Sequence, residues 1–255
     1  FRDITKHYEN PEGEDTRALK NINLTVKDGE FVCILGPSGC GKSTLLEIAA
    51  GLLPCSEGEI LLDGKLQNGT SRDIGVVFQD SSLFPWRSIR KNIEFGLEIA
   101  GVDKDLRAQK VQKAIEMVGL KGFENKYPHQ LSGGMRQRAG IARTLVNEPA
   151  CILMDEPFSA VDHLTRLTLQ DEIVRIWQKE KKTILFITHD VSEAVYLATR
   201  IILLTPRPGR IQRIFDVPYD RPRNRNNPGL LDIVEKIYIC LNNPEGKEDE
   251  IEYNI

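Results

Sequence analysis

The sequence lacks the features that mark membrane-spanning, secreted or zinc-binding chains. No run approaches the roughly 18 consecutive apolar residues of a membrane span, and the first ten residues contain no apolar stretch like that of a signal peptide. No two of the five cysteines form a C-x-x-C pair, and several lie in apolar runs, which predicts reduced, buried thiols and a cytoplasmic protein. The formal net charge is −3, so the charge balance indicates no nucleic-acid partner.

The chain does contain alternating apolar runs and helical stretches, the pattern of a parallel sheet. Its 255 residues suffice for one large α/β domain. Residues 31–35, 151–154 and 183–187 are apolar runs of strand length, as expected for strands covered on both faces. Shorter alternating strands before residue 31 and around 59–63 predict an antiparallel lobe at the sheet edge. The predicted fold class is therefore α/β.

The rest of the chain predicts an insertion and a C-terminal extension. Charged, helix-forming sequence without a strand run predicts a helical lobe inserted at about 85–148 within a domain of residues 1–220. Residues 221–255 are predicted to form a C-terminal helix and an acidic tail, frayed from position 244 onward. Five apolar residues lie at helical spacing in that helix: Leu230, Ile233, Val234, Ile237 and Leu241.

Residues 36–44 match the phosphate-binding pattern G-x-x-x-x-G-K-[ST]. Glycines let several backbone N–H groups point at one anion, and the helix predicted from position 42 to about 50 adds its own N-terminal N–H groups. Lys42 then supplies a cation for the β- and γ-phosphates, and Ser43 a hydroxyl ligand for Mg²⁺. A chance glycine-rich turn is the alternative, which the strand–loop–helix context disfavours. The predicted nucleotide-binding residues are Gly36, Pro37, Ser38, Gly39, Cys40, Gly41, Lys42, Ser43 and Thr44.

Two adjacent acids, Asp155 and Glu156, follow the predicted strand 151–154. Because successive side chains on a strand point to opposite sides, the two acids can have different roles. Asp155 fits the Mg²⁺-side carboxylate of a phosphate-loop site, and Glu156 can reach the attacking water as a general base. Two acids that simply end a strand at the surface are the alternative, which the phosphate loop makes a poor one.

Residues 131–138, Leu-Ser-Gly-Gly-Met-Arg-Gln-Arg, resemble the signature of the ATP-binding-cassette (ABC) ATPases, and the resemblance extends over about residues 1–215. It implies a P-loop NTPase (RecA-like) core with an antiparallel β lobe and an inserted α-helical lobe. It also implies a homodimer formed head to tail through ATP, in which Ser132, Gly133 and Gly134 contact the γ-phosphate held by the other subunit. Ser132 is also a good helix N-cap, and an ordinary capped helix is the alternative for this tetrapeptide taken alone.

Four further matches follow the order of the family's motifs. Tyr8 resembles the aromatic that stacks on adenine, although an ordinary packing role is also open for it. Gln79 resembles the glutamine that touches Mg²⁺ and water and connects to the helical lobe. Residues 159–162 resemble the D-loop, with Val161 where leucine is commoner, and His189 resembles the switch histidine that reaches the γ-phosphate. The remaining histidines are predicted to be structural or surface residues: His7, His129 and His163.

The resemblance implies a complete site for ATP and Mg²⁺. Its catalytic residues are Lys42, Gln79, Glu156 and His189. Its Mg²⁺ ligands are Ser43, Gln79 and Asp155.

Within this family, three segments resemble the importer ATPases that serve nitrate, aliphatic sulfonate and taurine, or thiamine-precursor systems. They are residues 83–87 (Leu-Phe-Pro-Trp-Arg), Met135, and residues 205–211 (Thr-Pro-Arg-Pro-Gly-Arg-Ile). The resemblance implies a separate membrane permease, an indirectly acting solute-binding protein and a location at the cytoplasmic face of the membrane. Phe84, Pro85 and Trp86 would lie near the groove for the permease; the alternative is that both aromatic rings pack inside the helical lobe.

The rival function is an ABC ATPase of DNA repair, chromosome structure or translation. Such proteins share the ATP site but usually add coiled coils, zinc modules, a second cassette or basic surfaces. The sequence contains none of these, so we expect no nucleic-acid partner.

Overall fold

A six-stranded sheet forms the centre of the structure, a computed structural model that describes residues 1–9, 15–159 and 161–243. The strand order is β11-β10-β3-β9-β8-β7, and all neighbouring pairs are parallel except β10 and β11. The three apolar runs predicted as strands are confirmed as β3, β8 and β9. The strands are β3 (Phe31–Leu35), β7 (Ile74–Val77), β8 (Cys151–Asp155), β9 (Thr183–Ile187), β10 (Arg200–Leu204) and β11 (Ile211–Asp216).

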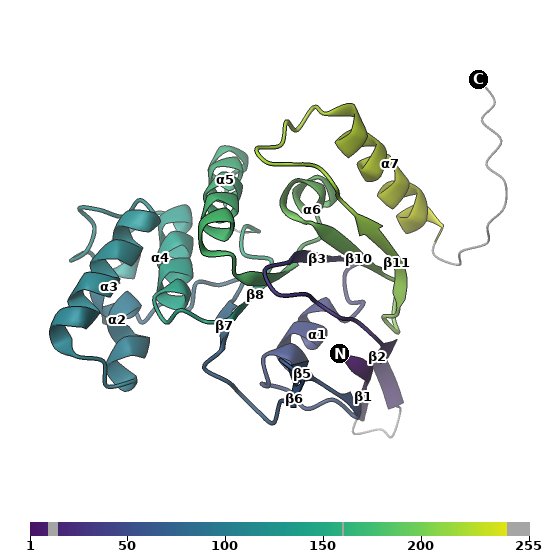
Figure 1. Cartoon of the computed structure of the whole chain (residues 1–255), viewed down its shortest axis with the longest axis horizontal. Helices are drawn as coiled ribbons and strands as arrows, with labels where there is room; N and C mark the ends of the chain where they lie inside the picture. Colours follow the sequence, from purple (N-terminus) through teal and green to yellow (C-terminus); the bar gives the residue numbers. More distant parts are fainter. Residues whose placement is uncertain (10–14, 160, 244–255) are drawn as a thin grey trace.

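Helices cover both faces of this sheet (Figure 1), which is why β3 is buried throughout. Phe31, Cys33 and Leu35 pack on the side of α5 (His163–Glu180), α6 (Val191–Leu197) and α7 (Pro228–Asn242). The alternate residues Val32 and Ile34 pack on the side of α1 (Lys42–Ala49). The two-residue period of the strand thus divides the core into two apolar clusters.

The predicted antiparallel lobe is present, but it does not extend the edge of the central sheet. It is a separate three-stranded sheet of order β2-β1-β4, accompanied by the hairpin of β5 and β6. Its apolar side chains, such as Ile4 and Leu19, join the cluster around α1, so the lobe lies against one face of the core (Figure 1). The strands are β1 (Arg2–Glu9), β2 (Asp15–Ile22), β4 (Glu57–Glu59), β5 (Leu61–Leu62) and β6 (Lys65–Leu66).

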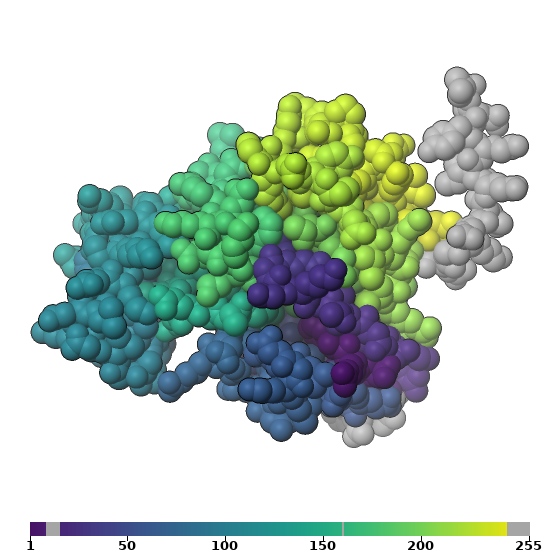
Figure 2. All heavy atoms as spheres, viewed as in Figure 1, coloured from purple at the N-terminus to yellow at the C-terminus, as the bar shows by residue number. Residues whose placement is uncertain are grey.

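Three helices between β7 and β8 form a lobe on one flank of the molecule (Figure 2): α2 (Ile89–Ile99), α3 (Lys104–Met117) and α4 (Gly133–Leu145). A short 3-10 helix, η1 (Pro128–Gln130), precedes α4. The lobe has its own apolar cluster, to which α2, α3 and α4 all contribute. It occupies the stretch where the sequence predicts a helical insertion; the boundaries 85–148 stay a prediction.

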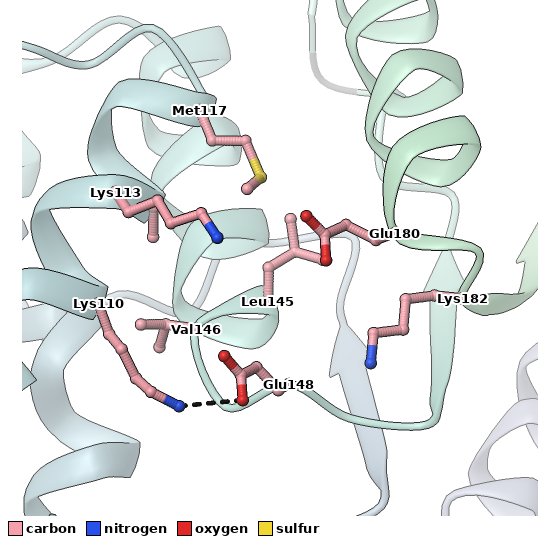
Figure 3. Close-up of a pocket in the computed structure, with 9 residues that line it drawn as sticks. Lys110, Lys113, Met117, Leu145, Val146, Glu148, Glu180 and Lys182 are labelled. Carbon is pink, nitrogen blue, oxygen red and sulfur yellow. Dashed lines mark hydrogen bonds and ion pairs between the residues drawn. The ribbon is translucent and has the colours of Figure 1, made fainter.

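A pocket lies where α3 and α4 meet the end of α5 (Figure 3). The ion pair between Lys110 Nζ and Glu148 Oε2, 2.9 Å long, lies at this pocket. None of the residues predicted to bind nucleotide lines it.

Helix α7 lies in the stretch where the sequence predicts a C-terminal helix, and it buries Leu230, Ile233 and Ile237 against the core; the boundaries 221–255 stay a prediction. The acidic tail predicted from residue 244 lies outside the described residues. In the part of the chain that the structure describes, no helix is both long and apolar enough to cross a bilayer. All five cysteines are free thiols, but the prediction that they are buried holds only for Cys33 and Cys40. The other three are half-buried: Cys55, Cys151 and Cys240.

Candidate nucleotide-binding site

The loop of residues 36–44 connects the carboxyl end of β3 to the first turn of α1. Gly39 and Gly41 have φ values of +76° and +104°, in the left-handed region that favours glycine. A Cβ on Gly41 would also lie 2.7 Å from Leu19 Cδ2 and 2.9 Å from the Ala18 carbonyl oxygen. Position 41 therefore requires glycine on two grounds, and the loop takes the curled form that suits an anion.

Lys42 is buried at the centre of this loop, with 6% of its surface exposed. Its Nζ donates hydrogen bonds to the carbonyl oxygens of Gly36 and Pro37, at 2.9 and 3.0 Å. Because the hydrogen bonds of this buried ammonium go to neutral carbonyls, the position remains favourable for an anion. The loop and its lysine thus fit the phosphates of a nucleotide.

Ser43 and Asp155, which are 112 positions apart, meet beside the loop. Ser43 Oγ donates to Asp155 Oδ1 at 3.2 Å. Burial raises the pKa of the Asp155 carboxyl, and the neighbouring carboxylates of Glu156 and Glu47 raise it further, while the Ser43 hydrogen bond and Lys42 lower it. A divalent cation would relieve this crowding of negative charge.

These two oxygen donors fit Mg²⁺, which is usually held by one or two carboxylates together with substrate phosphates and water. Among the residues that the structure describes, no cluster of three or more His, Cys, Asp or Glu could hold a metal by itself. The third predicted ligand, Gln79, is exposed and follows β7, where Val77 pairs with Met154 of β8. The structure thus brings Gln79 to the same sheet edge as Asp155.

Glu156 and His189 form the next contact, with Glu156 Oε2 and His189 Nδ1 3.0 Å apart. Asp155 and Glu156 are not separated as successive residues of one strand, which is what the sequence predicts, because β8 ends at Asp155 and Glu156 lies outside the strand. Glu156 has a φ of +41°, and its N–H donates to the carbonyl oxygen of Ile187 in β9 at 3.0 Å. A left-handed backbone at a non-glycine residue costs on the order of 1–3 kcal/mol and is typical of functional sites.

Tyr8 lies beside the phosphate loop but is not tightly packed. Its ring is 38% exposed, and its hydroxyl is 3.4 Å from Thr44 Oγ1. The ammonium of Lys6 is 5.3 Å from the ring centroid. An exposed aromatic face next to the loop is available to a flat base.

The signature residues form the start of α4. Ser132 is its N-cap, as predicted, and its side chain accepts a hydrogen bond from the Met135 N–H at 3.3 Å. Gly133 and Gly134 form the first turn. No hydrogen bond between described residues joins these three residues to the phosphate loop.

The D-loop match falls partly outside the described residues, which omit Ala160. Asp162 is the N-cap of α5 and accepts a hydrogen bond from the Thr165 N–H at 3.0 Å. Of the two aromatics proposed to meet a permease, Phe84 packs 4.7 Å from Phe95 between ring centroids, whereas Trp86 is 72% exposed. The lobe therefore half-buries Phe84 and leaves Trp86 exposed.

Sequence reasoning missed the polar residues behind His189. A small pocket beside Glu156 and His189 is lined by Thr188, Arg166 and the buried carboxyl of Glu193. Burial raises the pKa of the Glu193 carboxyl. The available signal was one acid within the short, otherwise mostly apolar helix Val191–Leu197.

This chain is similar to known proteins both in sequence and in structure. The family described as ABC transporter matches residues 19–159. An uncharacterized ABC transporter ATP-binding protein of Methanocaldococcus jannaschii is 54% identical over 229 residues, which cover 90% of this chain and 86% of that protein. The aliphatic sulfonates import ATP-binding protein of Bacillus licheniformis is 46% identical over 222 residues, which cover 87% of this chain and 86% of that protein.

A solved dimeric ATP-binding cassette in a post-hydrolysis state, bound to ADP and Pi, matches with a TM-score of 0.76 and 35% identity, over 86% of this chain and 98% of that chain. The predicted fold class and the predicted resemblance to importer ATPases are confirmed by these matches. The chain therefore belongs to the ABC transporter family, as one of its ATP-binding and ATP-hydrolysing subunits.

Proposed function

We propose that this chain is the ATPase subunit of an importer for a small solute, of the nitrate, sulfonate or taurine type, and that it works beneath a separate membrane permease. The observation that carries the ATPase chemistry is the 3.0 Å contact between Glu156 and His189 beside the Ser43–Asp155 pair. The importer assignment is supported by the sulfonate-import relative.

In the proposed reaction the loop N–H groups and Lys42 hold the phosphates. Ser43, Asp155 and Gln79 would hold Mg²⁺, which when bound neutralises charge on the β- and γ-phosphates. Glu156 orients a water molecule for in-line attack and accepts its proton. His189 contacts both Glu156 and the γ-phosphate, and thereby fixes the carboxylate relative to the reacting atoms.

The proposed active unit is a head-to-tail homodimer. Ser132, Gly133 and Gly134 sit at the N-terminus of α4, where unpaired N–H groups favour an anion. Within one chain they form no hydrogen bond with the described residues of the phosphate loop, so a second chain has to supply the cap. Tyr8 would stack on the adenine of the nucleotide held by its own chain.

The permease partner is proposed to bind at the helical lobe. Trp86 is 72% exposed, and a solvent-exposed indole is a common anchor of protein interfaces. Phe84, half-buried against Phe95, and Pro85 would fix the position of Trp86. A solute-binding protein would act only through the permease, and this subunit would lie at the cytoplasmic face of the membrane.

An ABC ATPase acting on nucleic acid is the second candidate, which the net charge of −3 disfavours. Affinity purification of the chain from its own cells in mild detergent, with mass spectrometry of the co-purifying proteins, separates the two. We expect a multi-span permease and a solute-binding protein. Nucleic-acid or ribosomal proteins instead would keep the ATPase chemistry and overturn the transport assignment.

A further inference from the structure

Arg225 lies between β11 and α7, outside every motif of the nucleotide site, yet its guanidinium is held from several sides. Nη1 donates to Gln170 Oε1 at 2.7 Å, and Nη2 to Asp171 Oδ1 at 3.2 Å. The guanidinium carbon is 3.5 Å from the centroid of the Tyr196 ring, and the Tyr196 hydroxyl donates to the same Asp171 oxygen at 2.6 Å. Two helices of the core, α5 and α6, therefore fix this side chain in one orientation.

Gln170 connects Arg225 to the buried carboxyl of Glu193. Its Oε1 accepts from Arg225, and its Nε2 donates to Glu193 Oε1 at 2.8 Å. Gln170 and Glu193 are 2% and 5% exposed, so water does not compete for these bonds. Because the amide is used at both ends, its orientation is set by Arg225 on one side and by Glu193 on the other.

Glu193 also contacts the turn that carries His189. Its carboxyl and Thr188, the residue before His189, line the same pocket beside His189. Thr188 Oγ1 also accepts from the Asp190 N–H at 3.0 Å, and Asp190 Oδ1 accepts from the Glu193 N–H at 3.0 Å. The Glu193 backbone is thus bonded to Asp190, which is bonded to Thr188, so both residues that flank His189 belong to one hydrogen-bonded turn that includes Glu193.

The charges around Glu193 leave this carboxyl dependent on its partners. Asp190 lies close enough to oppose its ionisation, and Arg166, which pairs with Asp190 at 3.6 Å, favours it. A buried carboxylate is stable only when hydrogen-bonded. Gln170 supplies such a bond, and Arg225 polarises the Gln170 amide toward Glu193.

From these contacts we infer that Arg225 is a positioning residue for ATP hydrolysis, acting through Gln170 and Glu193 on the turn that holds His189. The inference rests on the proposed role of His189. According to this inference, the segment between β11 and α7 contributes to ATP hydrolysis. If the segment were purely structural, it would only attach α7 to the core.

The test compares steady-state ATPase turnover and ATP affinity for the full chain and its variants. Arg225→Ala should lower kcat by about 10- to 100-fold, the scale of a small displacement of a reacting group, and leave the Kd for ATP unchanged. Arg225→Lys keeps the charge but not the two-pronged contact, and should show an intermediate kcat. Should Arg225→Ala fail to fold, Arg225→Lys carries the test. Wild-type turnover in either folded variant would overturn the inference.

Arg213→Ala is the matched control. Arg213 lies in β11 and donates to Cys240 Sγ of α7 at 3.9 Å, so its removal weakens the attachment of α7 without touching Gln170. We expect wild-type kcat for it. An equal loss in Arg213→Ala and Arg225→Ala would mean that attachment of α7, rather than the link to Gln170, sets the rate.

Two further variants separate this inference from the function on which it rests. Wild-type turnover in His189→Ala would refute the proposed role of His189 itself, and with it this inference. A loss in His189→Ala with none in Arg225→Ala would refute the inference alone.

A double variant tests the link itself. Gln170→Ala combined with Arg225→Ala should lose no more turnover than the larger single effect, because both substitutions break the same series of hydrogen bonds. Additive losses would count against that series.

Discussion

The imidazole of His189 lies 3.0 Å from the carboxylate of Glu156, although 33 positions separate the two residues. β8 and β9 are parallel neighbours, so their carboxyl ends meet at one edge of the sheet. Asp155 pairs with Ile187 in that register, and the Glu156 N–H bonds the Ile187 carbonyl oxygen. The site is therefore assembled because β8 and β9 are neighbours in the sheet. Glu156 directly follows β8, and its left-handed backbone turns its side chain toward His189.

Replacing Glu156 by glutamine should separate chemistry from binding. The amide cannot accept the proton of the attacking water, so turnover should fall about 10²- to 10⁴-fold while ATP still binds. The variant should accumulate as an ATP-bound dimer, detectable by light scattering. Glu148→Gln, at the distant ion pair with Lys110, is the matched control and should hydrolyse normally. A wild-type rate in Glu156→Gln would rule out this residue as the base.

Lys42→Ala should act on affinity. Among the described residues, the buried ammonium donates hydrogen bonds to carbonyl oxygens of its own loop, and it can turn from them to a phosphate. Charged hydrogen bonds contribute roughly 1.5–3 kcal/mol each, so ATP affinity measured by calorimetry should fall by at least about tenfold. Lys110→Ala provides a control at a lysine outside the site. Unchanged ATP binding in Lys42→Ala would refute the phosphate contact.

Two glycines of the loop should respond differently to alanine. Gly41→Ala places a Cβ 2.7 Å from Leu19 Cδ2 and in a left-handed backbone, and should destabilise the fold by more than about 1 kcal/mol. Gly39 is also left-handed, but nothing lies within 4 Å of its Cβ position, so Gly39→Ala should cost less. Urea unfolding of both variants checks the difference. Equal losses would mean that backbone strain alone decides.

Ser132→Arg should block closure of the dimer in a Glu156→Gln background, because a long cation would occupy the helix end that has to approach the partner's nucleotide. The substitution also removes the N-cap of α4, which by itself costs about 1 kcal/mol. Ser132→Asn retains a capping side chain and should still dimerise. An ATP-induced dimer of the Ser132→Arg variant would contradict the composite site.

The phosphate loop and its partners could be predicted because their signals are local. A glycine pattern between an apolar strand and a helix needs no knowledge of distant residues, and the Ser132 cap depends on three neighbours. The conformation of Glu156 could not be predicted, because it follows from its bond to β9. Nor could the link from Arg225 to Glu193, since its members come from three separated segments and share no motif.

The raised pKa of Glu193 leads to a prediction about stability and pH. Burial raises this pKa above its ordinary value of 4.5, so the folded state binds more protons than the unfolded state as pH rises through that window. The free energy of unfolding should therefore fall there, and at neutral pH the folded protein should bear the cost of a buried carboxylate.

Glu193→Gln removes the charge but keeps an oxygen to accept from Gln170. Its unfolding free energy in urea should equal or exceed that of the wild type at pH 7, and the difference should vanish as pH falls below 4.5, where the wild-type side chain is also neutral. Comparing the two proteins at each pH cancels the titration of all other groups. A variant less stable than the wild type at pH 7, by a margin that shrinks on acidification, would mean that the ionised carboxylate stabilises the fold and that its partners outweigh its burial.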